Sequence, residues 1–193
     1  MNPATGPLYR TCEISDLSEI QSFRRNAFVA YSQIGRPIDP KLMGDRWDEV
    51  SVHLGLLYGN QLVGAVRFSP PVQGRLPVHD YIPAPVNDFL QYADESSEIM
   101  EVSRALIHPK HRNIIGPIVF AKAVYNHILS HPTHILVDVL LNNAKTRAEG
   151  HFLRLGLIDT GIRYWDGRYG SVSAVMIGAR QTIVANITQY LSH

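Results

Sequence analysis

Three side chains that could take part in catalysis lie in one apolar segment of the chain. Ile99–Ile107 is rich in apolar and β-branched residues, which predicts a buried strand. The segment nevertheless contains Glu101, Ser103 and Arg104. A carboxylate is expensive to bury unless it is paired or used, and burial raises its pKa, as a general base requires. We therefore predict that Glu101 faces a cleft and serves as a base there.

The spacing of these residues calls for an irregular strand. Side chains alternate across a strand, so Glu101 and Arg104 lie on opposite faces if the strand is regular. Only a bulge brings both side chains to one site, and we predict a bulge between them. A backbone N–H freed there, such as that of Ser103, could donate to a reacting carbonyl oxygen. The alternative is a structural ion pair between Glu101 and Arg104.

A basic loop follows this strand and could bind an anion. His108-Pro109 ends the strand, because proline removes a ladder donor and restricts the residue before it. Gly116-Pro117 then begins a helix, whose first N–H groups and dipole favour a phosphate. The polar and basic residues around this helix start are Lys110, His111, Arg112, Asn113 and Lys122. An ordinary solvated basic loop is the alternative.

A second group of charged side chains lies earlier in the chain. Arg24 and Phe28 fall on a predicted helix, next to an apolar stripe that includes Ile20, Phe23 and Ala27. Asp45 and Asp48 lie one helical turn apart in a connecting segment and could grip a cationic amine. Arg67 ends a hairpin strand. The alternatives are a solvated face for Arg24 and its neighbour Arg25, and helix capping or surface solubility for each aspartate.

The elements that must position these residues alternate between strands and helices. The predicted strands are Leu8–Ile14, Val50–Leu57, Gln61–Phe68, Ile99–Ile107, His134–Leu141, Ile158–Tyr164 and Ser171–Ile177. The predicted helices start at Asp16, Val86, Gly116, Asn142 and Arg180, and the one after Gly116 should bury Ile118, Ala121, Val124, Tyr125 and Ile128. Ser69–Pro85 is predicted to be loop. This order predicts an α/β fold with a mixed, mostly antiparallel central sheet flanked by helices.

Composition limits the classes of function. The 193 residues, 45% hydrophobic and 18% charged, suffice for one globular domain, predicted to span residues 1–193. A net charge of +1 gives no polybasic surface for nucleic acid. The single Cys12 excludes an internal disulfide and indicates the reducing cytoplasm. No apolar run resembles a signal core or reaches membrane-spanning length. Of nine histidines, His108 and His111 are close together, but no carboxylate or thiol lies at ligand spacing, so we expect no metal.

The order of the elements resembles the GNAT acyltransferase fold. Phe152–Leu157 is similar to the aromatic-x-x-x-Gly-hydrophobic ending that GNAT proteins often show after their penultimate helix. The loop Arg112–Gly116 resembles the GNAT pyrophosphate loop, with one glycine where the family commonly has two. Such a loop suits a carrier with a single phosphate.

Short motifs over about half of the chain resemble the acyl-homoserine-lactone synthases and their GNAT relatives, the long-chain N-acyl amino acid synthases. The matching residues are Arg24 and Phe28, Asp45-x-x-Asp48, Gly64-x-x-Arg67 and Glu101-x-Ser103-Arg104. The lactone synthases have a tryptophan shortly after the position of Phe28, and the stretch 30–36 of this chain has none. We therefore favour the amino acid synthases.

The resemblance implies an N-acyltransferase that moves a long-chain fatty acyl group from acyl carrier protein to the amine of an amino acid such as tyrosine. It implies catalytic roles for Glu101, Ser103 and Arg104, substrate binding by Arg24, Phe28, Asp45, Asp48 and Arg67, and carrier binding by Lys110, Arg112, Asn113 and Gly116. The co-substrate would be an acyl-phosphopantetheine thioester, with no tightly bound cofactor. The alternatives are a lactone synthase using S-adenosylmethionine and a non-catalytic GNAT-like protein that binds acyl groups or lipids.

Overall fold

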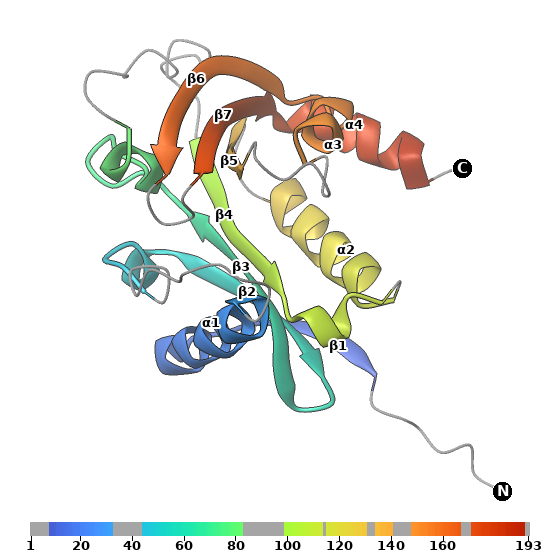
Figure 1. Cartoon of the computed structure of the whole chain (residues 1–193). Helices are drawn as coiled ribbons and strands as arrows, with labels where there is room; N and C mark the ends of the chain where they lie inside the picture. Colours follow the sequence, from blue (N-terminus) through green and yellow to red (C-terminus); the bar gives the residue numbers. More distant parts are fainter. Residues whose placement is uncertain are drawn as a thin grey trace, which may run out of the picture. The chain divides into compact units, whose positions relative to one another are not determined.

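The computed structural model describes residues 8–32, 44–82, 99–113, 115–130, 134–140, 148–166 and 171–191. The chain forms two compact units. The first consists of residues 1–67 and 104–126, and the second of residues 68–103 and 127–193. Figure 1 shows the helices and strands of both.

The elements follow the predicted order closely. In chain order they are β1 (Tyr9–Glu13), α1 (Leu17–Ser32), η2 (Asp48–Val50), β2 (Val52–Tyr58), β3 (Gln61–Ser69), η3 (Pro77–Asp80), β4 (Ile99–Ile107), η5 (Pro109–His111), α2 (Ile115–Ser130), β5 (His134–Leu140), α3 (Ala148–Arg154), β6 (Ile158–Asp166), β7 (Ser171–Ala179) and α4 (Arg180–Leu191). The strand order is β1-β2-β3-β4-β5-β7-β6. The pair β4–β5 is parallel, and β1–β2, β5–β7 and β6–β7 are antiparallel. The predicted α/β class with a mixed sheet is therefore confirmed.

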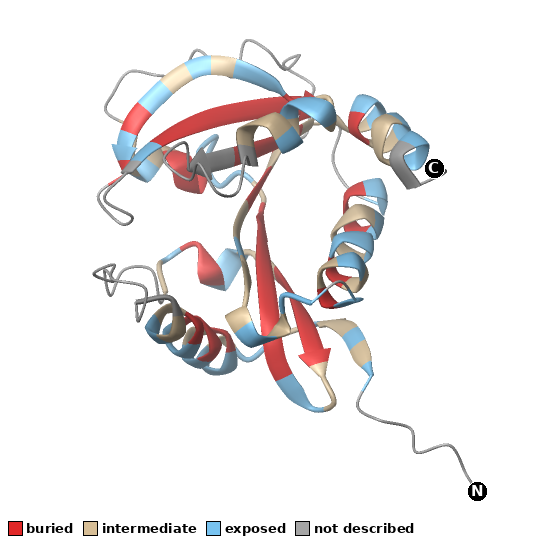
Figure 2. Cartoon of the chain, turned by 45° about the vertical axis from the view of Figure 1, so that its right-hand side comes forward, coloured by how far each residue is buried: buried red, intermediate tan, exposed pale blue. Residues whose placement is uncertain are grey.

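The core of the first unit lies between α1 and the β2–β3 hairpin. Gly59 makes the hairpin turn with a φ of 61°, a conformation that glycine adopts without strain. The buried face of α1 consists of Ile20, Phe23 and Ala27, as predicted, and it packs with Leu57, Leu62 and Ala65. Figure 2 shows the burial of β3, in which every residue after Gln61 is buried. A strand buried in this way holds the polar side chain at its end, Arg67, in a fixed position.

The start of α1 is capped by the predicted residue. One carboxylate oxygen of Asp16, Oδ1, accepts from the backbone N–H of Ser18 at 2.8 Å and from that of Glu19 at 3.4 Å. These bonds satisfy two of the N–H groups that a helix start leaves open. The hydroxyl of Ser18 also donates to Oδ1 at 2.6 Å, and this bond, followed by the backbone bonds, holds the pKa of Asp16 below its usual 3.8.

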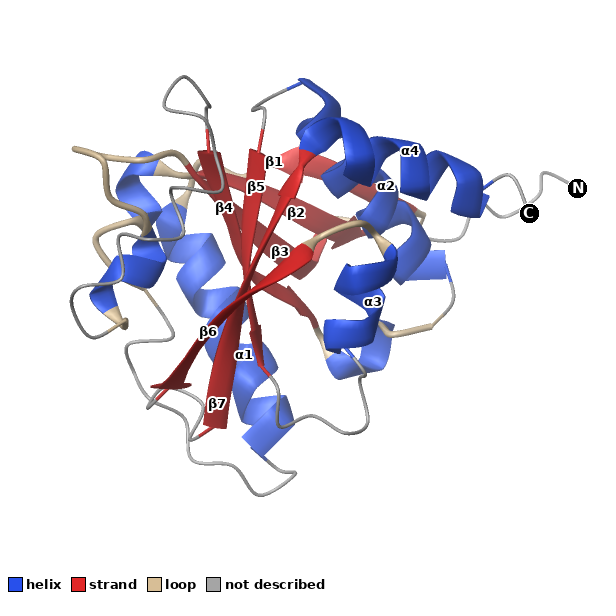
Figure 3. Ribbon diagram, turned by 90° about the horizontal axis from the view of Figure 1, so that it is seen from above, coloured by secondary structure: helices blue, strands red, loops and turns tan. Residues whose placement is uncertain are grey.

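The second unit is built on β5 and β7. Ile135, Leu136 and Val137 are all buried, so β5 is covered on both faces as predicted. β7 pairs with β5 on one side and with β6 on the other. Figure 3 shows the strands in red and the helices in blue. The core here consists of Leu76, Val78, Ile99, Leu136, Tyr164, Val175 and Ile177.

β4 contributes its first half to the second unit and its last residues to the first. Ile99–Val102 pair with His134–Val137 of β5. Arg104 then has a φ of 55°, in the left-handed region that non-glycine residues rarely adopt. β4 therefore departs from regular strand geometry at Arg104, and the predicted bulge between Glu101 and Arg104 stays a prediction.

The predicted buried stripe of α2 was right only in part, since Ile128 is buried. Ile118 is 58% exposed and Ala121 is also exposed, whereas Phe120 and His127 are buried. The helix is apolar on nearly every side, so its periodicity does not determine which face is buried. Ser69–Pro85 was predicted to be loop, but its described part contains the short helix η3.

Some predictions fall outside the described residues. They are the helix at Val86–Tyr92, the Asn142 helix start and most of the turn that begins at Asp166. Within the described part of the chain, no helix combines the length and the apolar character needed to cross a membrane.

Candidate active site

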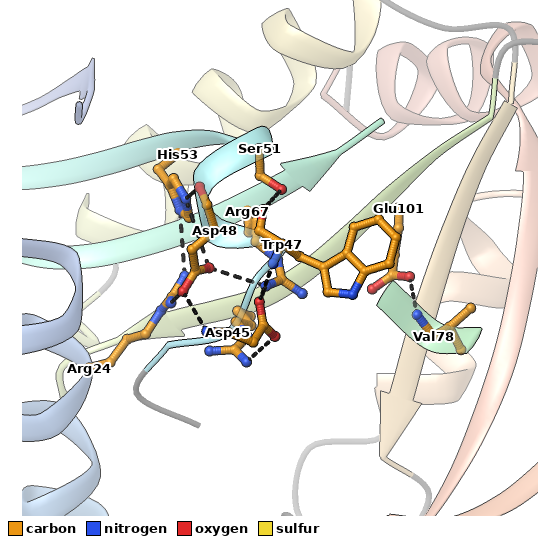
Figure 4. A network of polar contacts seen from close by, with 10 residues as sticks. Arg24, Asp45, Trp47, Asp48, Ser51, His53, Arg67, Val78 and Glu101 are labelled. Atoms are coloured by element: carbon orange, nitrogen blue, oxygen red, sulfur yellow. Dashed lines mark hydrogen bonds and ion pairs between the residues drawn. The ribbon is translucent and has the colours of Figure 1, made fainter. Parts of the chain in front are cut away.

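Five charged side chains of the first unit form a buried ion-pair cluster, which we call the arginine–aspartate cluster (Figure 4). Nη1 of Arg24 donates to Oδ2 of Asp48 at 2.7 Å. Nη1 of Arg67 donates to Oδ1 of Asp48 at 3.1 Å and to Oδ1 of Asp45 at 2.6 Å. Nη2 of Arg104 donates to the other oxygen of Asp45 at 2.5 Å. Each aspartate therefore bridges two arginines, and α1, η2, β3 and β4 are tied together.

The turn before η2 aims both carboxylates at these arginines. Oδ1 of Asp45 accepts from the backbone N–H of Trp47 at 3.0 Å, and the N–H of Asp45 donates to Oδ2 of Asp48 at 3.2 Å. The indole of Trp47 is itself buried. A turn that is hydrogen-bonded on itself in this way holds the carboxylates without help from a ligand.

Burial divides the cluster into an interior part and a more accessible edge. The side chains of Arg24, Asp48 and Arg67 are at most 2% exposed, whereas that of Asp45 is 15% exposed. Asp48 therefore cannot meet a ligand in this arrangement, and Asp45 is the carboxylate that a substrate could reach. The alternative of a solvated face holds for Arg25 and fails for Arg24.

The electrostatics keep the interior carboxylate ionised. Burial acts to raise the pKa of Asp48, but the nearby guanidinium groups outweigh burial and hold this pKa below 3.8. Arg24 contributes most to that lowering, before Arg104 and Arg67. Burial lowers the pKa of Arg24 from its usual value, and the negative charge of Asp48 opposes this shift. Three guanidinium groups share two carboxylates, so the five side chains together carry one positive charge.

Glu101 lies in the second unit, where a short helix holds its carboxylate. Oε2 of Glu101 accepts from the backbone N–H of Val78 at 2.7 Å (Figure 4). Val78 belongs to η3, which begins with Pro77, and the N–H of Leu76 donates to Nδ1 of His79 at 2.9 Å. Glu101 is 2% exposed, so it is buried as the strand pattern predicts. That it faces a substrate cleft stays a prediction.

Three further residues were predicted to be functional: Ser103 and Arg104 on β4, and Phe28 on α1. Ser103 and Phe28 are both partly exposed, on β4 and α1 respectively. The side chain of Arg104 is 4% exposed and forms its ion pair with Asp45.

The basic loop is held by a chain of side-chain bonds to β1. The N–H of Gly116 donates to Oδ1 of Asn113 at 3.0 Å, and Nδ2 of Asn113 donates to the hydroxyl of Tyr9 at 2.7 Å. The same hydroxyl lies 3.3 Å from Nδ1 of His111. Asn113 thus caps the first turn of α2. The basic side chains Lys110, Arg112 and Lys122 are exposed.

Gly116 is required by the close approach of this loop. A Cβ at this position would lie 2.8 Å from the carbonyl oxygen of His111 and 3.2 Å from the ring of Tyr9. The single glycine of the predicted phosphate loop therefore has a packing function.

Two residues that bond to the predicted functional side chains, one in each unit, carried no recognised signal in the sequence. Val78 lies in a proline-rich stretch predicted to be loop, and only the apolar residues on either side of Pro77, Leu76 and Val78, suggest a buried turn. His53 is 3% exposed and adjoins Asp48 and Arg24. A polar residue inside the otherwise apolar strand Val52–Tyr58 is the signal that could have identified it.

No metal site emerges from the described residues. No group of three or more histidine, cysteine, aspartate or glutamate side chains among them could hold a metal ion. His108 and His111 have ring centroids 6.1 Å apart.

Known proteins share this fold. An N-acyl amino acid synthase, FeeM from uncultured soil microbes, is 14% identical, with a TM-score of 0.70 over 95% of this chain and 98% of FeeM. The ribosomal-protein-S18-alanine N-acetyltransferase of Escherichia coli is 11% identical, with a TM-score of 0.56 over 89% of this chain and 94% of the enzyme. NAA60 of Arabidopsis thaliana, in complex with acetyl-CoA, is 12% identical, with a TM-score of 0.53 over 89% of this chain and 97% of NAA60. No curated protein sequence shows a significant match.

The family is settled by sequence rather than by these distant structures. Residues 23–119 match the profile described as the acetyltransferase (GNAT) domain. This range includes the whole arginine–aspartate cluster, Glu101 and the basic loop. The chain belongs to the GNAT acetyltransferase family.

Proposed function

We propose that the protein is an N-acyltransferase that joins a long-chain fatty acyl group, delivered by acyl carrier protein, to the amine of an amino acid such as tyrosine. The observation that carries the proposal is the arginine–aspartate cluster. Its five residues come from four separate stretches of sequence, and each was picked out by resemblance to the N-acyl amino acid synthases and lactone synthases. Short motifs that matched by chance would not be expected to converge on shared ion pairs.

The charge of the cluster suits an amino acid acceptor. Three guanidinium groups and two carboxylates leave one positive charge, which favours binding of a carboxylate nearby. Asp45 is the least buried carboxylate of the cluster and can meet the amine of the same ligand. Phe28, partly exposed on α1, offers an apolar contact to its side chain. An acceptor with both an amine and a carboxylate thus agrees better with the cluster than a simple amine does.

The chemistry assigned to β4 is amide formation from a thioester. Glu101 takes a proton from the ammonium group, directly or through water, so that the amine nitrogen can attack the thioester carbon. The carbon–sulfur bond then breaks, and the thiol of the carrier leaves with a proton. A backbone N–H beside the irregularity at Arg104, that of Ser103, donates to the developing oxyanion, an effect of about 3 kcal/mol in known oxyanion holes.

The co-substrate in this proposal is an acyl-phosphopantetheine thioester, with no tightly bound cofactor. Asn113 accepts a hydrogen bond from the N–H of Gly116, in the first turn of α2. Because this N–H is then not available to a ligand, the helix start suits a single phosphate better than a diphosphate. Lys110 and Arg112 are exposed beside it and would contact the acidic carrier.

The decisive experiment supplies candidate donors and acceptors and weighs the products. The purified protein is incubated with palmitoyl-carrier protein or palmitoyl-coenzyme A and each of the common amino acids or S-adenosylmethionine. We expect an N-acyl amino acid from the carrier thioester. An acyl-homoserine lactone would instead favour the S-adenosylmethionine reaction, and carrier binding without any product would favour the non-catalytic alternative.

Two matched variants connect the result to the cluster. Arg104→Gln removes a buried arginine that pairs with Asp45 and should abolish product. Arg163→Gln removes an arginine that is 34% exposed and pairs with Asp159, so product formation should be unchanged. Equal activity of the two variants would show that the arginine–aspartate cluster is not needed for the reaction.

A further inference from the structure

His53 lies at the inner end of the arginine–aspartate cluster and bonds to two of its elements. It is the second residue of β2 and is 3% exposed. Its Nε2 lies 3.0 Å from the backbone carbonyl oxygen of Asp48, and its Nδ1 lies 3.5 Å from Nη2 of Arg24. The same guanidinium reaches the carboxylate of Asp48 through Nη1. The guanidinium of Arg24 therefore donates through Nη1 to the carboxylate of Asp48 and through Nη2 to the imidazole of His53.

These contacts identify the tautomer of the ring. A carbonyl oxygen can only accept a hydrogen bond, so Nε2 of His53 must carry the hydrogen that it donates to Asp48. A guanidinium can only donate, so Nδ1 must present a lone pair to Arg24. The ring is therefore neutral and protonated at Nε2.

The charges around His53 also favour the neutral ring. Arg24 on α1 and Arg67 on β3 face it as cations, and Asp48 on η2 is the nearest anion. Glu13 and Glu49 line, with His53, an open hollow of about 280 Å³. Burial, followed by the repulsion of the arginines, lowers the pKa of His53 below 6.5, although its bond to the Asp48 carbonyl acts to raise it.

We propose that His53, as the neutral Nε2–H tautomer, is a positioning residue that holds Arg24 against Asp48 and fixes the turn from which Asp45 reaches the substrate. Nδ1 of His53 accepts from the guanidinium of Arg24 and orients it, and Nε2–H donates to the backbone carbonyl of Asp48 and holds η2 in position. Protonation would place a second cation against Arg24 and remove the lone pair that orients it. The effect on turnover rests on the proposed function, whereas the state of the ring does not.

The ring state is tested without any substrate. The ¹⁵N chemical shifts of uniformly labelled protein, with the His53 signal assigned by its absence from the His53→Asn variant, report which nitrogen carries hydrogen. We expect neutral His53 with hydrogen on Nε2 from pH 7 down to below pH 6. A charged ring at pH 7, or hydrogen on Nδ1 alone, would overturn the proposal even if the protein made the expected product.

The positioning role is tested by two substitutions and a control. His53→Asn keeps an acceptor near the position of Nδ1, whereas His53→Phe keeps neither contact. We expect His53→Phe to raise KM for the amino acid about tenfold or more, which corresponds to the loss of one hydrogen bond to a charged group. We expect KM of His53→Asn to stay close to that of the wild type. The wild type should lose kcat/KM toward acid pH more steeply than His53→Asn. His151→Asn changes an exposed histidine of α3 and should match the wild type.

A purely structural role would give a different result. In that case both His53 variants would lower the fraction of folded protein, with KM and the pH profile of the folded fraction unchanged. That result would overturn the proposal. If the wild type forms no N-acyl product at all, the proposed function fails, and the ¹⁵N shifts alone then decide the state of His53.

Discussion

The interior carboxylate of the arginine–aspartate cluster gives the strongest prediction for stability. Asp48→Asn keeps the shape of the side chain but removes the charge that faces Arg24 at 2.7 Å and Arg67 at 3.1 Å. Each hydrogen bond between charged groups contributes about 1.5–3 kcal/mol, and breaking a buried ion pair from one side costs about 3–5 kcal/mol. We therefore expect the free energy of unfolding to fall by about 3–5 kcal/mol.

A matched substitution on the surface separates burial from ion pairing as such. Asp159 pairs with Arg163 in the second unit, and the side chain of Asp159 is 30% exposed. Exposed pairs contribute roughly 0–1 kcal/mol. Asp159→Asn should therefore change the free energy of unfolding by about 1 kcal/mol or less. Urea denaturation followed by circular dichroism measures both variants, with the m-value as a check that the unfolding transition is unchanged.

The comparison with Asp159→Asn can refute this reasoning. If Asp48→Asn lost no more stability than Asp159→Asn, the cluster would not be held by charge in the folded protein. The pH dependence gives a second check. The pKa of Asp48 is below 3.8 in the folded protein, so its contribution is complete above the unfolded value and is lost as the pH falls below 3.8 toward the folded value. The difference between wild type and Asp48→Asn should shrink over that range.

Three further changes test the other parts of the site. Glu101→Gln should lose most N-acyl product in a mass-spectrometric assay while staying folded by circular dichroism, because the amide can still accept from the backbone; near wild-type turnover would remove this residue as the base. Lys110→Glu with Arg112→Glu should raise the apparent KM for acyl carrier protein, mainly at low salt; an unchanged KM would place docking elsewhere. Gly116→Ala should lower the free energy of unfolding, measured by thermal unfolding, by about 1–3 kcal/mol, because its Cβ would lie 2.8 Å from a carbonyl oxygen. Gly150→Ala on α3, where a Cβ would meet nothing within 4 Å, should be neutral or stabilising. Equal effects of the two substitutions would show that the loop can rearrange to accommodate the methyl group.

The sequence predicted the strands and α1 well because their signals are local and strong. The buried residues of α1 recur at helical spacing, and Asp16 caps the helix as its position indicates. The run His134–Leu140 is apolar on both faces, which fits a strand inside a sheet. An irregularity in this strand was expected from chemistry, because two candidate functional side chains three residues apart reach one site only through a break in the alternation, and Arg104 has a φ of 55°.

The failures have equally specific causes. The buried face of α2 was predicted only in part because an almost wholly apolar helix gives little contrast between its faces. The partner of Glu101 could not be foreseen, since a backbone N–H has no side chain to mark it in a sequence. His53 was missed because a lone histidine in a strand matches no motif. Its importance arises only once Arg24 and Asp48 are folded against it.

The arginine–aspartate cluster explains how motif residues far apart in sequence can depend on one another. Each aspartate bridges two arginines, so the loss of either carboxylate leaves positive charge in the interior that the remaining partners cannot balance. The interior residues Asp48 and Arg67 hold Asp45 in place, because Asp48 accepts from the backbone N–H of Asp45 and Arg67 donates to its carboxylate. Under the proposed function, selection for substrate binding at Asp45 would act on all five positions, although Asp45 is the most exposed side chain among them.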